Sequence, residues 1–183
     1  SSDNIRCIHC LKTLYFKTDN KDEKATRDHV FPNSWYPDNT PNQVQRLNAP
    51  ACIKCNSGLG AMEKEVFTKL ACCVDHEKIE ASGINKKLLR SLGIGVDENI
   101  TSRELSEREK RRKKLISEMT PYTPDIKAFP GLGLHEGYLP EDHMTIPVPE
   151  ELKPVSEKIL RGLEYCIGDR YIEFPYITEI YFP

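Results

Sequence analysis

The sequence lacks a long apolar run, a large excess of one charge and a disulfide-like cysteine pattern. No stretch of the 183 residues approaches the roughly 18 consecutive apolar residues that would span a bilayer, so we expect no membrane partner. The first residues have neither a basic start nor an apolar core, which argues against a signal peptide. The net charge of −2 shows that the chain as a whole is not a basic nucleic-acid binder, although local patches decide contacts with phosphate.

The seven cysteines include two close pairs, Cys7-Ile-His-Cys10 and Cys52-Ile-Lys-Cys55. This arrangement does not suit the disulfide framework of a secreted protein, so we expect a reducing, cytoplasmic location. Zinc prefers a tetrahedron of thiolate and imidazole ligands, and two CxxC knuckles provide four thiolates. The spacing predicts a structural zinc site, with coincidental pairs of core cysteines as the alternative. The long insertion between the pairs indicates a functional segment, and His9 is expected at the surface.

Hydrophobic periodicity predicts short strands and amphipathic helices, separated by a segment rich in proline and glycine at residues 121–154. The strand-like runs are residues 14–16, 27–31, 44–47, 170–174 and 176–182. The helical runs are residues 62–74, 84–92, 101–119 and 155–163. Thr101 and Glu104 form a capping-box pattern at the start of the third helix. The basic run at residues 111–114 is expected to be solvated, with DNA contact as the alternative.

Asp28 and His29 lie between the cysteine pairs in a strand-like run. A carboxylate binds a hard divalent cation, and a neutral imidazole can take a proton from water near neutral pH. Together these groups suit metal-assisted hydrolysis of a phosphodiester. Neighbouring strand residues project to opposite faces, so the strand must distort for both to act together. The alternative is a surface histidine beside a charge. Asn56 adds a neutral oxygen donor, or it simply caps a helix.

Two segments carry a family resemblance. One is Arg27-Asp28-His29-Val30-Phe31-Pro32, and the other is residues 48–60, Asn-Ala-Pro-Ala-Cys-Ile-Lys-Cys-Asn-Ser-Gly-Leu-Gly. Together they resemble the HNH nuclease superfamily, with its ββα-metal fold, in the zinc-stapled form. The resemblance covers roughly residues 5–75.

The resemblance implies a role for each matching residue. His29 corresponds to the general base that activates the attacking water. Asp28 and Asn56 correspond to ligands of a catalytic divalent cation, usually Mg²⁺. Asn48 corresponds to the middle signature residue, which holds the base through the neighbouring loop. Arg27 is a candidate for contact with the substrate phosphate, with an exposed strand arginine as the alternative.

The sequence departs from the family pattern at two places. Asn48 stands one residue out of step with the family's middle asparagine, where Leu47 is found, and Asn42 is an outside candidate for that role. Gly60 stands where some relatives have a further histidine ligand, which leaves Mg²⁺ with two protein ligands and more water. Glu63 and Glu65 are possible additional ligands, but we expect them to face solvent.

We therefore expect an α+β protein with a zinc-stapled nuclease module at residues 1–75. A helical segment at 76–120 and a Pro-rich segment with a helix and short strands at 121–183 follow, separate from the module or packed on it. The expected activity is Mg²⁺-dependent hydrolysis of phosphodiester bonds in DNA, with RNA as a further possibility, by a homodimer or a larger complex. The alternatives are a non-catalytic zinc-ribbon module that binds nucleic acid or protein, and an effector subunit of a larger defence system.

Overall fold

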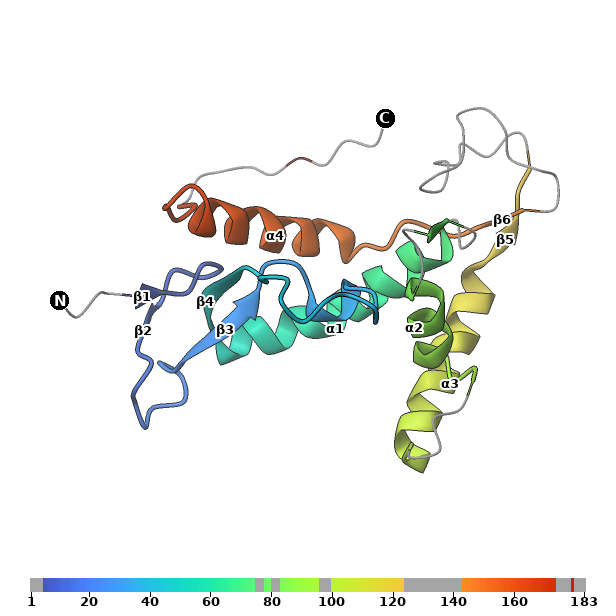
Figure 1. Cartoon of the computed structure of the whole chain (residues 1–183), viewed down its shortest axis with the longest axis horizontal. Helices are drawn as coiled ribbons and strands as arrows, with labels where there is room; N and C mark the ends of the chain where they lie inside the picture. Colours follow the sequence, from blue (N-terminus) through green and yellow to red (C-terminus); the bar gives the residue numbers. More distant parts are fainter. Residues whose placement is uncertain are drawn as a thin grey trace. The chain divides into compact units, whose positions relative to one another are not determined.

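The computed structural model describes residues 5–74, 78–79, 83–95, 100–123, 143–173 and 179, and every structural statement below concerns these residues. They belong to two compact units. The first comprises Ser1–Trp35, Pro41–Val66 and Glu150–Tyr181. The second comprises Tyr36–Thr40, Phe67–Pro149 and Phe182–Pro183. The described residues form α-helices and short antiparallel strand pairs (Figure 1). The mixed α and β content agrees with the helices and strands predicted from hydrophobic periodicity.

The first unit is built on two antiparallel strand pairs. β1 (Ile5–Arg6) pairs with β2 (Thr13–Leu14) on either side of the first cysteine pair. β3 (Ala25–His29) pairs with β4 (Asn48–Cys52), and β4 runs directly into α1 (Ile53–Cys72). A short 3-10 helix, η1 (Asn33–Trp35), follows β3.

The strand expected at residues 44–47 is wrong in position, because β4 begins at Asn48. Pro50 stands in the middle of β4, where proline is uncommon because it has no N–H to donate. The Val30 N–H donates to the Leu47 carbonyl, so hydrogen-bonded pairs alternate along the ladder and Pro50 falls at a non-hydrogen-bonded position opposite Arg27. A missing N–H there costs β3 nothing. The Pro50 carbonyl instead accepts a hydrogen bond from the Ile8 N–H, at 3.0 Å.

α1 begins nine residues earlier than the apolar periodicity of residues 62–74 suggests, since its first residue is Ile53. Gly58 and Gly60 weaken the helical pattern in these first turns. The second cysteine pair supplies the helix start instead. The Cys55 N–H donates to Cys52 Sγ at 3.4 Å, so a sulfur takes the place of the usual N-cap oxygen.

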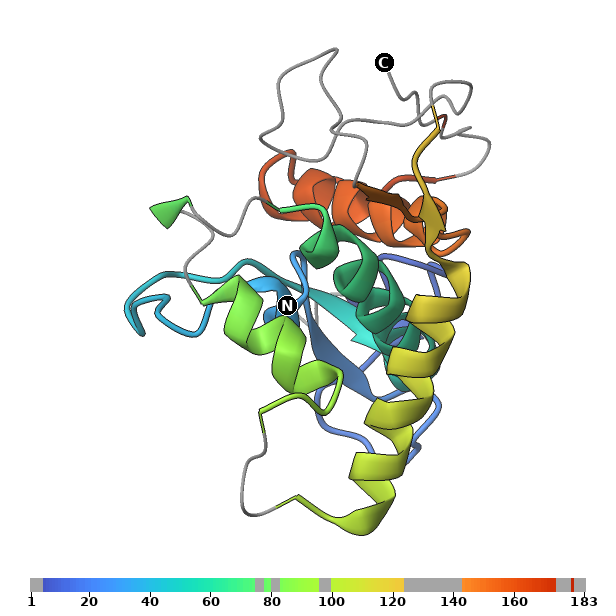
Figure 2. The same cartoon turned by 90° about the vertical axis from the view of Figure 1, so that its right-hand side faces the viewer.

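The C-terminal helix α4 (Leu152–Cys166) completes the first unit. It packs against the β3–β4 hairpin through a buried apolar cluster, and lies beside that hairpin in both views (Figures 1 and 2). The cluster consists of Ile8, Val30 and Ala49, with Leu47, Ile159, Leu163, Tyr165, Cys166 and Tyr171 packed against it. The helix buries Val155, Lys158 and Gly162, so a lysine stands on its apolar face.

The strand expected at residues 170–174 does not form over residues 170–173, and the rest of the two predicted C-terminal strands lies largely outside the described residues. Tyr171 is used in packing instead. Its hydroxyl accepts a hydrogen bond from the Arg6 N–H at 3.1 Å, and the Arg6 guanidinium lies 4.4 Å from the centre of its ring. The Tyr165 ring lies 5.3 Å away.

The second unit contains α2 (Ile84–Ser91) and α3 (Ser102–Glu118), which lie side by side in both views (Figures 1 and 2). The capping box of Thr101 and Glu104 is confirmed. Arg108 and Arg111 donate to the carbonyls of Arg90 and Ser91 at the end of α2. Part of the basic run therefore stabilises a helix C-terminus. β5 (Thr120–Pro121) pairs with β6 (Met144–Thr145), within the segment that was expected to be irregular.

Gly162 allows α4 to approach the hairpin closely. A Cβ at this position would lie 2.7 Å from Val30 Cγ2, and Val30 is itself fully buried. We predict that Gly162→Ala lowers the free energy of unfolding by about 1–3 kcal/mol, because the overpacked core must shift. Gly58→Ala, in open space on α1, serves as the control and should be neutral or stabilising by up to about 1 kcal/mol. Urea unfolding followed by circular dichroism checks both, and equal stability of the two variants would contradict the prediction.

Candidate functional site

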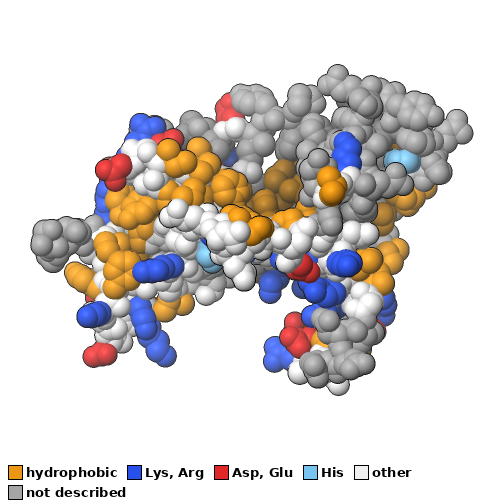
Figure 3. Space-filling model, in the orientation of Figure 1, with side chains coloured by type: hydrophobic (Ala, Val, Ile, Leu, Met, Phe, Trp, Pro, Cys, Tyr) orange, Lys and Arg blue, Asp and Glu red, His pale blue; other side chains and the backbone are white. Residues whose placement is uncertain are grey.

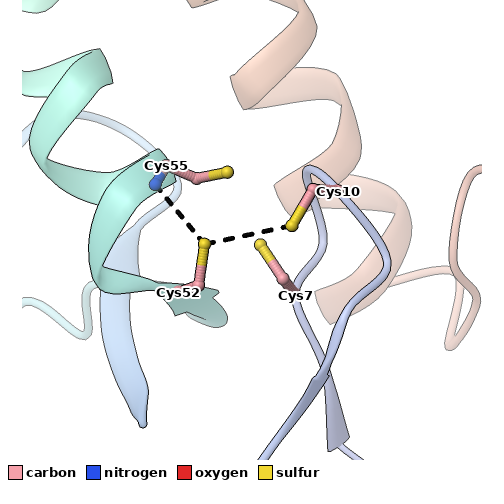
Figure 4. A group of neighbouring side chains, drawn as sticks. All are labelled: Cys7, Cys10, Cys52 and Cys55. Atoms are coloured by element: carbon pink, nitrogen blue, oxygen red, sulfur yellow. Dashed lines mark hydrogen bonds between the residues drawn. The ribbon is translucent and has the colours of Figure 1, made fainter. Parts of the chain in front are cut away.

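The four paired cysteines converge at one point of the first unit. The Sγ atoms of Cys7, Cys10, Cys52 and Cys55 all lie within 4.8 Å of one another (Figure 4). A Zn–S bond of about 2.3 Å places the sulfurs of a tetrahedron about 3.8 Å apart, and Cys10 Sγ lies 3.9 Å from Cys52 Sγ. None of the four forms a disulfide. The cluster can hold a structural metal such as zinc, which confirms that the cysteine pairs come together as their spacing predicts.

The cysteine cluster joins two parts of the unit. Cys7 and Cys10 lie in the turn between β1 and β2, where the Leu11 N–H donates to the Cys7 carbonyl. Cys52 ends β4, and Cys55 lies in the first turn of α1. A metal bound here would fix the first hairpin to the start of the helix. Burial raises the pKa of the Cys7 and Cys55 thiols, so metal binding must displace their protons.

Asp28 is buried and both its carboxylate oxygens are engaged. Its Oδ2 lies 3.0 Å from His9 Nε2, and its Oδ1 lies 2.9 Å from Lys158 Nζ. Lys158 Nζ also donates to the main-chain carbonyl of His29 at 2.6 Å and pairs with Glu63 Oε1. We call Lys158, Asp28, Glu63 and His9 the Lys158 cluster. It forms a buried polar centre between β3, α1, α4 and the first cysteine turn.

Two expectations about this cluster are wrong. His9 was expected at the surface, but its side chain is only 9% exposed and bonds to Asp28. Glu63 was expected to face solvent, but its side chain is 15% exposed and pairs with Lys158. Lys158 was not among the residues predicted from the sequence. The available signal was its place three residues after Val155, on the apolar stripe of an amphipathic helix where a lysine needs a buried partner.

His29 ends β3 and lies directly opposite Asn48 in the antiparallel register. Side chains that face each other across such a pair project from the same side of the ladder. His29 Nδ1 is buried and has no hydrogen-bond partner among the described residues. Asn48 is exposed, and its Nδ2 donates to the Arg46 carbonyl at 2.7 Å, which ties down the loop before β4. Cys166 Sγ lies 3.4 Å from the Asn48 carbonyl.

Asn56 lies on the first turn of α1 and is connected to β3. Its Nδ2 donates to Thr26 Oγ1 at 3.1 Å, and the Thr26 hydroxyl donates to the Ala51 carbonyl at 2.8 Å. Thr26 and Asp28 stand two residues apart on the strand and therefore share a face. The structure brings Asn56 to the face of β3 that carries Asp28. His29, one residue along, projects from the other face in the regular ladder.

The remaining candidates lie outside these contacts. Arg27 and Asn42 are exposed. Gly60 has open space around its Cα, so the helix is not packed closely there. The face drawn in Figure 3 carries Lys and Arg side chains in several separate places, mixed with hydrophobic ones. No helix of the described residues combines the length and apolar content needed to cross a bilayer.

The oxygens of Asp28 and Asn56 have the chemistry that Mg²⁺ prefers. The arrangement of Asp28 nevertheless does not fit a bound cation, because Lys158 and His9 occupy its carboxylate. Among the described residues, the four cysteines are the one group of three or more His, Cys, Asp or Glu side chains placed to share a metal.

Comparisons with known proteins found no family model, curated protein or solved structure that matches this chain.

We predict that the purified chain contains close to one zinc per molecule and that Cys10→Ser lowers this content and the thermal stability. Cys73→Ser is the matched control, since Cys73 lies outside the cluster and bonds to the Lys69 carbonyl. Zinc competes with protons for thiols whose pKa values are raised, so the affinity should increase with pH through the neutral range. Metal analysis and a chromogenic zinc-release titration check this. Equal zinc content in both variants would refute the assigned ligands.

Proposed function

We propose that this chain is a metal-dependent endonuclease of the HNH type that hydrolyses phosphodiester bonds in DNA. The observation that carries the proposal is the succession of β3, β4 and α1, with Cys52 and Cys55 of the cysteine cluster at the junction of β4 and α1. In it His29 stands opposite Asn48, while Asp28 and Asn56 lie on one face of β3. A hairpin that runs straight into a helix brings the oxygen donors Asp28 and Asn56 to one face of β3, and His29 ends the same strand.

His29 is the proposed general base. A neutral imidazole has one donor and one acceptor nitrogen, and a buried nitrogen without a partner costs free energy in a folded protein. Such an atom is therefore a candidate for function rather than structure. His29 Nδ1 is an atom of this kind. We propose that the imidazole takes the proton of the attacking water, and that Asn48 holds the loop beside it through the Arg46 carbonyl.

Asp28 and Asn56 are the proposed ligands of the catalytic cation, and Mg²⁺ suits their oxygens best. Such a cation would supply positive charge near the departing oxygen. For Asp28 to hold it, the Lys158 ammonium would have to leave the Asp28 carboxylate. Arg27 is exposed on the same strand and is proposed to contact a substrate phosphate. Zinc, in this proposal, has a structural role only.

A second candidate is a non-catalytic module that keeps the zinc-stapled scaffold and binds nucleic acid or protein. The contact of Lys158 with Asp28 favours it, because a buried lysine neutralises the carboxylate without any metal. Both candidates place the protein in the cytoplasm, with DNA as the first partner to test, RNA as the second, and a homodimer or a larger complex as the possible assembly.

We predict that zinc-loaded protein nicks supercoiled plasmid with Mg²⁺ and that His29→Ala slows cleavage by about 10²–10⁴-fold. The variant keeps the main-chain carbonyl that Lys158 binds, so the fold should persist. His143→Ala, in the second unit, is the histidine control and should cleave at the wild-type rate. Gel electrophoresis of the plasmid measures the rates.

Two results would count against this function. Undiminished cleavage by His29→Ala would sink the role of the base. Absence of cleavage of both DNA and RNA by zinc-loaded wild type would favour the binding module.

A further inference from the structure

We propose that the Lys158 ammonium occupies the cation position of this site, so that Lys158 and a divalent cation compete for Asp28 and Glu63. The inference rests on the proposed role of Asp28 as a cation ligand. It adds Glu63 and the His29 carbonyl as ligands, and it makes α4 the element that regulates access of the metal.

The ammonium is surrounded by oxygen atoms from separate parts of the first unit. Asp28 Oδ1 lies 2.9 Å and the His29 carbonyl oxygen 2.6 Å from Lys158 Nζ, and Glu63 Oε1 is the third partner. An ammonium group has three donors, so each N–H has one acceptor. Two carboxylates and a main-chain carbonyl are also the ligand types that hard divalent cations select.

The charges of Lys158, Asp28 and Glu63 favour the exchange of one cation for another. Two carboxylates face one ammonium, and the side chain of Lys158 is 1% exposed. Removal of the positive charge would leave the buried Asp28 and the half-buried Glu63 close together without compensation, which is unfavourable. A divalent cation supplies the charge that both carboxylates need. The site therefore requires a positive charge in either state, and the two states exclude each other sterically.

α4 is held in the position that directs Lys158 into this site. The Arg161 guanidinium donates to the His9 carbonyl at 2.6 Å, and Gly162 packs on Val30. His9 in turn contacts Asp28 from the other side of the carboxylate. The lysine has a flexible four-carbon stem, so its head can withdraw while the helix stays in place. A shift of α4 would remove it altogether.

The test measures cation binding without nucleic acid. Lys158→Met keeps the apolar stem and removes the charge, and Lys153→Met, at an exposed position of the same helix, is the matched control. Mn²⁺ is titrated calorimetrically into the zinc-loaded chain. We expect Lys158→Met to bind Mn²⁺ at least ten times more tightly than the wild type or Lys153→Met. Adding Asp28→Asn or Glu63→Gln to Lys158→Met should abolish this gain.

Folded, zinc-loaded Lys158→Met with wild-type affinity for Mn²⁺ would overturn the proposal. Tighter binding that survives loss of Asp28 or Glu63 would do so too, because the ion would then lie elsewhere. If Lys158→Met does not fold, the wild type gives a second test by labelling with N-hydroxysuccinimidyl acetate. Lys158 should react slowly without Mn²⁺ and faster as Mn²⁺ is raised, with Lys153 as the internal reference. Labelling of Lys158 that does not respond to Mn²⁺ would contradict the competition.

These results separate this inference from the proposed nuclease activity. A protein that cleaves no nucleic acid but shows the Asp28-dependent gain in Mn²⁺ affinity supports the competition and rejects the nuclease. A protein that cleaves DNA, and whose Lys158→Met variant loses cleavage with no gain in Mn²⁺ affinity, rejects the competition and retains the nuclease.

Discussion

The four-cysteine cluster is the constraint on which the first unit depends, because the hydrophobic core around it is small. The buried residues of this core are Cys7, Leu14, Ala25, Ala51 and Cys52, most of them with small side chains. Two-stranded pairs such as β1–β2 and β3–β4 are marginally stable by themselves. A metal on four thiolates offers a far larger stabilisation than these contacts, because its binding free energy becomes folding free energy.

The polar residues of the candidate site depend on the same cluster. His9 lies between two of the cysteines and bonds to Asp28, while the adjacent Ile8 N–H fixes the Pro50 carbonyl. On the other side of the site, Cys52 caps the helix that carries Asn56 and Glu63. A metal held by the four cysteines would have no direct part in the proposed chemistry, yet it would fix the positions of the groups on both sides of Asp28. Without a metal at the cysteines, His9, Asn56 and Glu63 would be expected to shift together.

The features that depend on a local sequence pattern could be predicted. The cysteine pairs, the strand carrying Asp28 and His29, and the capping box at Thr101 all follow from residues close in the chain. The start of α1 did not, because two glycines obscure its period and a sulfur caps it. The position of β4 did not either, since the effect of Pro50 depends on which face of the ladder its nitrogen occupies.

Lys158 shows most clearly why the remainder of the site could not be predicted. Its partners Asp28 and Glu63 lie far away in the sequence and meet it only after α4 packs on the hairpin. A lysine on an apolar stripe indicates that a buried acidic partner exists, but the pattern does not identify the partner. The helix was predicted from its apolar residues, of which Val155 is buried and Leu160 is exposed, while the buried charged residue Lys158 was not predicted.

The ion pairs of Lys158 with Asp28 and Glu63 stabilise the fold and, in the proposed competition, oppose the binding of a metal. An ammonium attached to the fold competes with a free cation at an effective concentration set by its short reach, which for tethered groups is roughly millimolar or higher. A divalent cation must exceed this advantage through its double charge and its additional ligands. The same contact that keeps two carboxylates stable in a small core therefore opposes their use as metal ligands. Residues that serve function are often held at such a cost to activity. The packing of α4 on Val30 at Gly162 holds the stem of Lys158 beside the two carboxylates.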